Sequence, residues 1–309
     1  MIWSQRLRLR HLNLLIKLAE TGSLSDTARQ MHTTQPGLSK WLKELEEDVG
    51  APLFERHSRG LRPTAQGGLL LDHARRILGE MQRAQGNLEA LKQGNSLVVA
   101  LGTSPASAPT LVPAAIMGFL ERNPQARVEL QEGTMNTLLE RLEQGQLDVV
   151  IGRLDNYEPR ATLCSEMLYR EPLRIVARPD HPLARRERLE WGDLSDYDWI
   201  LWPRGTPIRS RLDGALANAG RKPLPCRIES SSQVGNLWLV KHSDMLSVSS
   251  ERVAAYFAGR GLLTVLPCEI EAAGSLGMCW RDDPHQARAT LDLLECLRQA
   301  VNLSPQENG

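Results

Sequence analysis

Hydroxyl, amide and cationic side chains recur between residues 33 and 62, on one predicted helix face and in the segment that follows it. Apolar residues at spacings of four, three and four predict a single buried stripe: Leu38, Leu42, Leu45 and Val49. The opposite face and the first turn hold the polar set: Thr33, Thr34, Gln35, Pro36, Ser39, Lys40 and Lys43. Three arginines come next: Arg56, Arg59 and Arg62. Such a face suits the base edges of a major groove, and permanent cations beside it suit phosphates or a minor groove.

Two short helices joined by a tight turn are needed to position that face. Ser23 can cap the first helix, and Asp26 can complete a capping box with it. The second helix can start at Thr33 or Thr34, because Pro36 is tolerated only in a first turn. The pair predicts a helix-turn-helix.

A basic hairpin is predicted after the second helix. Gly50, just past the last apolar position, and Pro52 end that helix. Residues 53–56 and 61–62 then predict two short strands joined by the polar turn 57–60. Helix, turn, helix and hairpin in this order favour a winged helix-turn-helix over the alternative, a structural helical hairpin with a solvated basic loop.

Several motifs in the first 67 residues match a known family pattern. They are Leu9–Leu12, Ala19–Leu24, Ala28, Thr34–Ser39, Leu45–Glu46, Leu53–Arg56 and Leu61–Gly67. With these motifs the chain resembles the LysR-type transcriptional regulators. The resemblance implies that four side chains lie at the DNA-facing end of the recognition helix: Gln35, Pro36, Ser39 and Lys40. Trp41 stands where the family often has Gln, which leaves the base preference at that position open.

A long helix is predicted after the hairpin, with apolar residues alternating by four and three: Leu70, Ala74, Ile77, Met81, Ala84, Leu88 and Leu91. About 28 helical residues would extend roughly 40 Å, and a 3.5-residue period asks for a partner helix. We therefore expect this seam to pair with a second copy of the chain rather than to pack on its own domain. A paired reader binds two half-sites, so we expect a near-palindromic DNA site.

Strands and helices alternate from residue 96 onward, which predicts an α/β unit with a parallel sheet. The expected strands are 97–101, 127–131 and 147–151, and the expected helices are 111–121 and 138–142. A second set begins near Trp199 and repeats the first at an offset of about 99 residues. Residues 173–177 would form one crossover between two lobes. Strand 278–280 and helix 287–301 would return the chain to the first lobe.

The predicted fold class is therefore α/β, with an N-terminal winged helix-turn-helix and a long linker helix. The family resemblance implies that the remainder is a two-lobed, periplasmic-binding-protein-like (type 2) effector domain. The expected domains are 1–66 for the winged helix-turn-helix, 67–94 for the linker and 95–309 for the effector domain. Lobe 1 would take 95–168 and 270–309, and lobe 2 would take 169–269.

A ligand is expected beyond the carboxyl ends of the strands, where helix N-termini offer free N–H groups. The residues at those positions are Thr103, Ser104, Thr134, Arg204, Thr206, Ser231, Ser232 and Gln233. Hydroxyls and an arginine favour a small anion, most simply a carboxylate, although hydroxyls at strand ends also serve as plain helix caps. The loop 202–207 and the stretch 241–245 resemble the family branch that senses sugars or aromatic acids, so a sugar derivative is a second possibility.

Composition and motif searches exclude several other classes. The formal net charge is zero, yet residues 1–93 hold 14 Lys and Arg against 10 Asp and Glu, so the basic excess is at the expected DNA-binding end. Five cysteines without a CxxC spacing suggest no metal site. No HExxH, GxSxG or GKS/GKT motif occurs, so neither catalysis nor a cofactor is expected. The N-terminus lacks a signal peptide and prolines interrupt the uncharged stretch 97–120, so we expect a cytoplasmic protein without a membrane partner.

The sequence thus predicts a LysR-type regulator that binds operator DNA as a homodimer or dimer of dimers, meets RNA polymerase, and responds to a small anion between its lobes. Two alternatives stay open. One is a redox-sensing transcription factor that acts through the cysteines. The other is a small-molecule binding protein whose N-terminal region is a protein-interaction module, which would show no salt-dependent DNA affinity.

Overall fold

The chain is described by a computed structural model that covers residues 3–58, 60–92, 94, 97–155, 157–158, 160, 162–270, 274–283 and 287–302. It divides into two compact units. The first comprises Met1–Glu89 with Glu143–Gln146, and the second comprises Ala90–Leu142 with Leu147–Gly309. Arg59, one of the three expected wing cations, lies outside the described residues.

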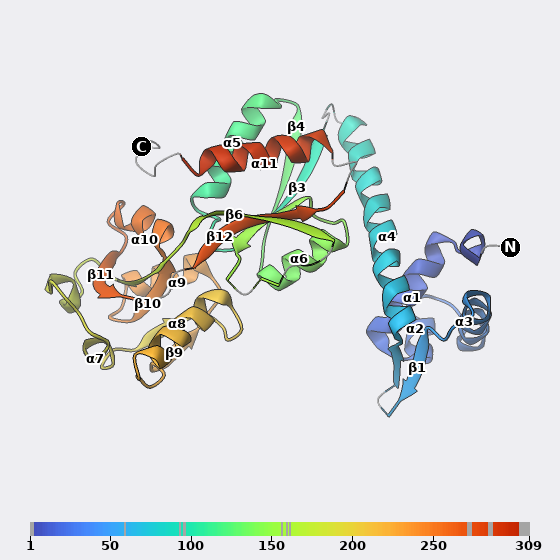
Figure 1. Ribbon diagram of the computed structural model, residues 1–309, viewed down its shortest axis with the longest axis horizontal. Helices are drawn as coiled ribbons and strands as arrows, with labels where there is room; N and C mark the ends of the chain where they lie inside the picture. Colours follow the sequence, from blue (N-terminus) through green and yellow to red (C-terminus); the bar gives the residue numbers. More distant parts are fainter. Residues whose placement is uncertain are drawn as a thin grey trace. The chain divides into compact units, whose positions relative to one another are not determined.

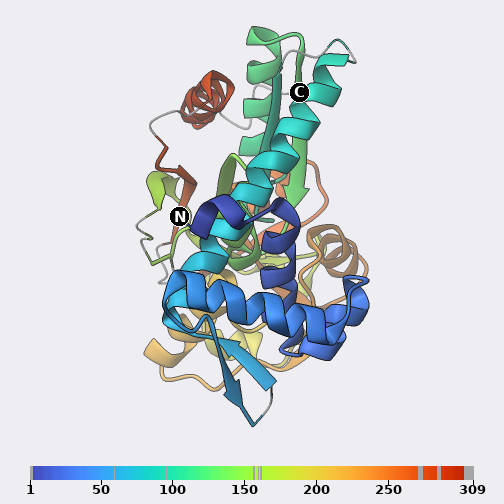
Figure 2. The ribbon, with the colours of Figure 1, turned by 90° about the vertical axis from the view of Figure 1, so that its right-hand side faces the viewer.

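The first unit is a small helical domain with a two-stranded hairpin (Figures 1 and 2). Its elements are η1 (Trp3–Arg6), α1 (Leu9–Thr21), α2 (Leu24–Gln30), α3 (Gln35–Val49), β1 (Phe54–His57), β2 (Gly60–Pro63) and the long helix α4 (Ala65–Lys92). Leucines and one phenylalanine from α1, α3, β1 and α4 form its core. The predicted winged helix-turn-helix is confirmed, with β1 shifted by one residue from the expected bounds and β2 longer by one residue at each end.

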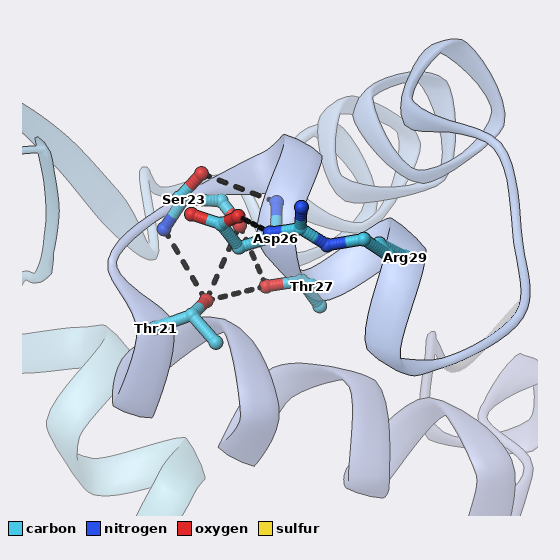
Figure 3. A network of polar contacts seen from close by, with 5 residues as sticks. All are labelled: Thr21, Ser23, Asp26, Thr27 and Arg29. Atoms are coloured by element: carbon cyan, nitrogen blue, oxygen red, sulfur yellow. Dashed lines mark hydrogen bonds and ion pairs between the residues drawn. The ribbon is translucent and has the colours of Figure 1, made fainter.

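The turn into α2 is fixed by hydroxyl groups, which Figure 3 shows. Ser23 caps α2 as expected, because its hydroxyl accepts from the N–H of Asp26 at 3.2 Å. The expected capping box is wrong, since the Asp26 carboxylate pairs with Arg29 one turn later instead. The N–H of Ser23 donates to the Thr21 hydroxyl at 3.3 Å, and that hydroxyl also bonds the buried Thr27. The Thr21 hydroxyl of α1 thus accepts from the N–H of Ser23, which the Asp26 carboxylate was expected to do.

The hairpin is held against the helices by backbone contacts that need glycine. The N–H of Leu61 donates to the carbonyl of Gly22 at 2.7 Å. Gly60 has φ +115°, and a Cβ there would lie 2.5 Å from the Gly22 oxygen, so a larger residue would break the contact. The Glu46 carboxylate of α3 accepts from the N–H groups of Leu53 and Phe54 at 2.7 and 3.1 Å. The recognition helix therefore positions the wing directly.

Helix α4 departs from the expectation of one continuous free seam. Ala74 is only 1% exposed, and Leu70 packs against the core of the winged domain. These two residues are therefore corrected: they belong to the fold of their own chain, because the first turns of α4 close the winged domain. The rest of the seam is exposed: Ile77, Met81, Ala84, Leu88 and Leu91.

The second unit contains two five-stranded sheets. The first sheet has the order β4-β3-β5-β12-β6, and the second has the order β11-β7-β10-β8-β9. The strands of the first are β3 (Leu97–Thr103), β4 (Ala126–Glu132), β5 (Val149–Arg153), β6 (Leu163–Arg170) and β12 (Ser275–Arg281). Those of the second are β7 (Leu173–Ala177), β8 (Trp199–Leu201), β9 (Cys226–Glu229), β10 (Leu246–Ser250) and β11 (Thr264–Glu269). In each sheet four strands run in one direction, and a single strand, β12 in the first sheet and β7 in the second, runs opposite to them.

Helices accompany each sheet and complete two lobes (Figure 1). The first lobe has α5 (Leu111–Arg122), α6 (Met135–Glu143) and α11 (Arg288–Ala300), with α5 and α11 packed on one core. The second has η2 (Pro182–Arg185), α7 (Trp191–Leu194), α8 (Pro207–Asn218), α9 (Gln233–Lys241) and α10 (Glu251–Ala258). The return to the first lobe by β12 and α11 confirms that prediction.

Two sequence-based boundaries were wrong. Residues 173–177 form strand β7 inside the second sheet, so the crossover is the short segment before them, at Glu171 and Pro172. The strand expected at 147–151 runs from Val149 to Arg153. A buried strand was expected to end at its last aliphatic residue, whereas here the last residue is a buried arginine. Among the described residues, no helix combines the length and apolarity that a bilayer span requires.

Candidate nucleic-acid interface and ligand cavity

Helix α3 presents its polar face to solvent. The Thr34 hydroxyl caps the helix by accepting from the N–H of Gly37 at 3.3 Å, and Pro36 lies in the first turn. Leu38, Leu42 and Leu45 are buried on the other side. Of the seven expected residues on this face, Ser39 is half-buried. The other six are exposed: Thr33, Thr34, Gln35, Pro36, Lys40 and Lys43. The amphipathic pattern therefore leaves this surface free for a partner.

The lysines of α3 make only loose ion pairs. Lys40 Nζ is 3.8 Å from Glu44, and Lys43 Nζ is 3.7 Å from Glu47, with both lysine side chains about four-fifths exposed. Exposed i,i+4 pairs contribute roughly 0.3–0.5 kcal/mol, so a phosphate can replace the carboxylates at little cost.

Trp41 has a packing role that the sequence did not reveal. Its half-buried ring joins the domain core and lies 5.2 Å from the His11 ring, measured between centroids. Burial, followed by the charges of Arg10 and Arg8, lowers the pKa of His11, so this imidazole is neutral near pH 7. The tryptophan thus ties α3 to α1.

The wing carries exposed cations on both strands. Arg56 on β1 lies opposite Leu61, and Arg62 on β2 lies opposite Glu55. Both arginines are exposed. Both arginines belong to the same unit as α3. The Glu46 carboxylate of α3 accepts from the backbone N–H groups at the start of the hairpin.

A cavity of about 570 Å³ is lined by both lobes of the second unit. The first lobe contributes Ser104, Pro105, Ala106, Glu132, Gly133, Thr134, Met135, Asn136, Leu139, Arg153 and Tyr157. The second contributes the continuous segment Trp202–Ile208 and Ser231. Five of the eight expected ligand residues therefore lie together: Ser104, Thr134, Arg204, Thr206 and Ser231. The volume suits a small organic molecule.

The other three expected residues are not part of this lining. Thr103 is buried beneath it, where its hydroxyl bonds Ser107 at 2.9 Å. Ser232 caps α9 by accepting from the N–H of Gly235 at 3.0 Å, and Gln233 begins that helix. The plain helix-cap interpretation is correct for Ser232. These positions follow the right strands, but the hydroxyls of Thr103 and Ser232 bond within the fold.

Arg153 is the main residue that the sequence reasoning missed. It lines the cavity with a side chain that is 2% exposed. Its Nε donates to Asp155 at 2.8 Å, and its Nη2 donates to the carbonyl of Glu171 at 2.8 Å. Nη1 has no partner among the described residues. An arginine directly after Val149–Gly152, an otherwise uncharged strand, was the signal that could have found it.

The two tryptophans near the cavity differ. Trp202 lines it and is anchored because its Nε1 donates to the carbonyl of Val248 at 3.1 Å. Trp238 is 61% exposed on α9 and stacks on His242. Trp202 can therefore offer a ring face to a ligand, whereas Trp238 lies outside the lining.

The cysteines do not form a reactive pair in this structure. All five are free, and three are buried. Burial raises the pKa of Cys279 to about 12 and also raises the pKa values of Cys164 and Cys296. Since the thiolate is the reactive form, this environment does not favour the redox alternative. Within the described parts of the chain, no group of three His, Cys, Asp or Glu residues could hold a metal ion.

A winged helix-turn-helix and a two-lobed ligand-binding domain in one chain define a DNA-binding transcriptional regulator with an effector-binding domain. The bacterial regulatory helix-turn-helix model of the lysR family matches residues 9–68. The LysR substrate binding domain model matches residues 92–302. The chain belongs to the LysR family of transcriptional regulators.

Relatives and solved structures agree with this assignment. The chain is 36% identical to the HTH-type transcriptional regulator GbpR of Azospirillum brasilense, over 96% of this chain and 87% of that one. It is 31% identical to PcaQ of Agrobacterium fabrum over 96% of each chain. The crystal structure of CbnR, a LysR family transcriptional regulator, is 22% identical and matches with a TM-score of 0.61 over 96% of this chain and 100% of that one. At this identity the last likeness shows the fold alone.

Proposed function

We propose that the chain reads operator DNA with α3 in a major groove and the wing on the adjacent backbone. The residues assigned to this contact are Thr33, Thr34, Gln35, Pro36, Ser39, Lys40, Lys43, Arg56, Arg59 and Arg62. The observation that carries the proposal is the exposed polar face of α3. The Glu46 carboxylate of the same helix binds the backbone of a hairpin that bears two exposed arginines. Helix faces of this kind read bases, while wing cations neutralise phosphates.

Pairing through α4 would double this reader. Leu88 and Leu91 are 60% and 58% exposed, and a second copy of the chain is the partner that a 3.5-residue apolar period fits. Together with Ile77, Met81 and Ala84 they form the seam that remains after Leu70 and Ala74 are removed. A homodimer, or a dimer of dimers, would then bind a near-palindromic operator and contact RNA polymerase from it.

The effector is proposed to be a small anion held in the cavity, a carboxylate or an acidic sugar derivative. Five hydroxyls and two arginines line it: Ser104, Thr134, Tyr157, Thr206, Ser231, Arg153 and Arg204. The chain would act without catalysis, in the cytoplasm where bacterial DNA lies. The proposal keeps the expected domain bounds of 1–66, 67–94 and 95–309, with the long helix as the linker.

The DNA proposal is tested by measuring affinity against salt concentration. Genome-wide mapping first supplies a bound site, and fluorescence anisotropy then follows the full chain on that duplex. Lys40→Ala should reduce the slope of log affinity against log salt by about 1, because one phosphate contact is lost. Gln35→Ala should cost about 1–3 kcal/mol and relax base preference.

Lys17→Ala is the control, because Lys17 is a half-buried lysine of the same domain that pairs with Glu20 on α1, away from the polar face of α3. It should leave both slope and affinity unchanged. Equal losses for Lys17→Ala and Lys40→Ala would show that α3 is not the reading face.

A further inference from the structure

We infer that Arg252 is a latch that holds the two lobes together beside their crossovers and limits how far they rotate against each other. Arg252 lies in the first turn of α10, in the second lobe, and its guanidinium contacts two elements of the first lobe. The inference goes beyond the proposed function, because it concerns the joint between the lobes and depends on neither a ligand nor DNA.

The two lobes do not share an apolar core within the described parts of the chain. The buried clusters around β3, β5 and β12 contain residues of the first lobe alone. Those around β7, β8 and β10 contain residues of the second lobe alone. Parts of a chain that are not joined by a large apolar interface are expected to move relative to each other. The angle between the lobes therefore depends on contacts beside the crossovers.

The backbone of Arg252 is fixed to the first crossover. Its N–H donates to Glu171 Oε1 at 3.0 Å, and the N–H of Glu251 donates to the carbonyl of Pro172 at 3.0 Å. Both N–H groups belong to the first turn of α10, where the helix itself offers no acceptor. The helix dipole also favours a carboxylate at this end. The Arg252 side chain therefore projects from a point that is attached to the crossover.

The side chain of Arg252 reaches two elements of the first lobe. Nη1 donates to the carbonyl of Val301 at 3.1 Å, directly after the last residue of α11. Cζ lies 3.8 Å from the centroid of the Tyr169 ring on β6. A cation is favoured at the carbonyl end of a helix and over the face of an aromatic ring. One arginine of the second lobe thus caps a helix of the first lobe and stacks on its edge strand.

The two contacts together suit an arginine and limit rotation. A flat guanidinium can lie on a ring with one face and donate from its edge, whereas an ammonium group has no planar face. Arg252 and Tyr169 are both half-buried, and partial removal from water strengthens a cation–π pair. Rotation of the lobes moves Val301 and Tyr169 relative to α10. The guanidinium therefore cannot keep both contacts through a large rotation, and the observed angle between the lobes is favoured.

A second arginine close by makes the same kinds of contact inside one lobe. Arg260, just past the end of α10, has its Cζ 3.7 Å from the centroid of the Tyr256 ring. Its Nη1 donates to the carbonyl of Tyr256 at 3.1 Å. Replacing Arg260 removes a stacked pair and a hydrogen bond of the same geometry without changing a contact to the first lobe. Arg260→Met is therefore the matched control for Arg252→Met.

Distances between spin labels on the two lobes test the latch in the full chain. Cys226 is an exposed native labelling site on β9, and Glu140→Cys adds an exposed site on α6 of the first lobe. The half-buried Cys164 is replaced by Ser in every variant, and the other three cysteines are buried. Excess unlabelled chain ensures that each pair of labels lies within one chain. Double electron–electron resonance then gives the distribution of distances between the two sites.

Arg252→Met should broaden the distance distribution or add a second peak, because both contacts to the first lobe are lost, whereas Arg260→Met should leave it as in the parent chain. Arg252→Lys keeps the charge without the flat face and should broaden it less. Tyr169→Leu removes only the ring contact and should also broaden it.

Thermal unfolding shows which variants are folded, and Arg252→Lys with Tyr169→Leu carries the test if Arg252→Met does not fold. An unchanged distribution in the folded variants of Arg252 and Tyr169 would overturn the latch. The same broadening with Arg260→Met would overturn it as well, since that variant changes the second lobe alone.

Discussion

The two lobes of the effector domain are built on the same plan. In each sheet β3 or β8 lies between two parallel strands. Beyond these come one antiparallel strand, β12 or β7, and an edge strand, β6 or β11, at the side where the crossovers enter. The repeat seen in the sequence at about 99 residues reflects this shared order. Equal topology gives both lobes strand ends that open on the same cavity, so differences in residues at equivalent positions decide what each lobe contributes.

The clearest difference lies at the end of the third parallel strand. β5 ends in Gly152 and Arg153, whereas β10 ends in Ser249 and Ser250. All but the glycine bear polar side chains, and all four residues are buried. The first lobe thus supplies a buried charge with a glycine beside it, and the second supplies neutral hydroxyls. One plan has placed a buried charge at this strand end in one lobe and neutral hydroxyls in the other.

Removing the charge should give the largest effect. Arg153→Met leaves Asp155 with a weaker partner and should lower the free energy of unfolding by about 3–5 kcal/mol, as for other broken buried ion pairs. Ser250→Ala, the equivalent change in the second lobe, should cost less than about 1 kcal/mol, because its hydroxyl makes no hydrogen bond within the described residues. Urea unfolding measures both. Adding Asp155→Asn to Arg153→Met should restore part of the lost free energy of unfolding. Equal losses for Arg153→Met and Ser250→Ala would show that the two strand ends do not differ in this way.

Glu171, in the crossover next to Arg153, should make stability depend on pH. Burial raises the pKa of its carboxyl from 4.5 to about 7, although the Arg252 N–H and the charges of Arg153 and Arg252 lower it in part. The folded state then holds the proton more tightly, so its contribution is complete below pH 4.5, falls as the pH rises and is lost above about 7. Glu171→Gln should remove this dependence, worth about 3 kcal/mol, in unfolding measured at pH 5 and pH 8.

Glu129→Gln provides the control for that experiment, because Glu129 is exposed on β4 and pairs with Arg127. It should retain the pH dependence of the parent chain. A Glu171→Gln variant with the same decline between pH 5 and pH 8 would show that another group is responsible.

Adding one carbon to Gly152 should have an intermediate effect. A Cβ at this position would lie 2.2 Å from Met135 Sδ and 2.8 Å from Ser104 Oγ, so both side chains have to move. Gly152→Ala should cost about 1–3 kcal/mol and should weaken carboxylate binding. Ser249→Ala, at the matching place in β10, should cost less than about 1 kcal/mol. Thermal unfolding with and without benzoate measures both the stability and the carboxylate binding. If Gly152→Ala changed neither, the space around Gly152 would not be tightly packed.

Helix caps at equivalent places should give the smallest difference. Ser232 caps α9 at 3.0 Å, whereas Thr134, before α6, accepts from the N–H of Thr137 at only 3.4 Å and lines the cavity. Ser232→Ala should therefore cost about 1 kcal/mol and leave carboxylate binding unchanged. Thr134→Ala should cost less stability and act on binding instead. The reverse pattern would mean that Thr134 is only a cap.

The recognition helix could be predicted from the sequence because its signals are local. Caps, proline, glycine and the apolar stripe of α3 all lie within twenty residues, and they fix helix bounds and exposed face together. The capping box failed because the Thr21 hydroxyl, two residues earlier, accepts from the N–H of Ser23, while the Asp26 carboxylate pairs with Arg29. Likewise, α4 has a regular seam, but the sequence does not say which part of it closes the winged domain.

The cavity was only half predictable, because its residues come from strand ends and loops that meet in space. The rule for α/β sheets found Ser104, Thr134 and Ser231. It missed Arg153 because a buried arginine contradicts the usual pattern of a core strand, and its partners, the Asp155 carboxylate and the distant Glu171 carbonyl, make it tolerable there. It included Thr103 because neighbouring residues in a strand point to opposite faces, and the sequence alone does not fix which one faces the ligand.

The second lobe contributes almost all of its lining as one uninterrupted segment, Trp202–Ile208. Specificity in this lobe is therefore concentrated in one segment: exchanging its residues, with the core side chains Trp202 and Ile208 kept, replaces most of one wall. The first lobe offers no such unit, since its lining comes from five separate stretches of chain. Divergence toward new effectors can proceed through the segment Trp202–Ile208 while the buried Arg153 stays as it is. Related regulators can then change the ligand shape that they bind and keep the same ligand charge.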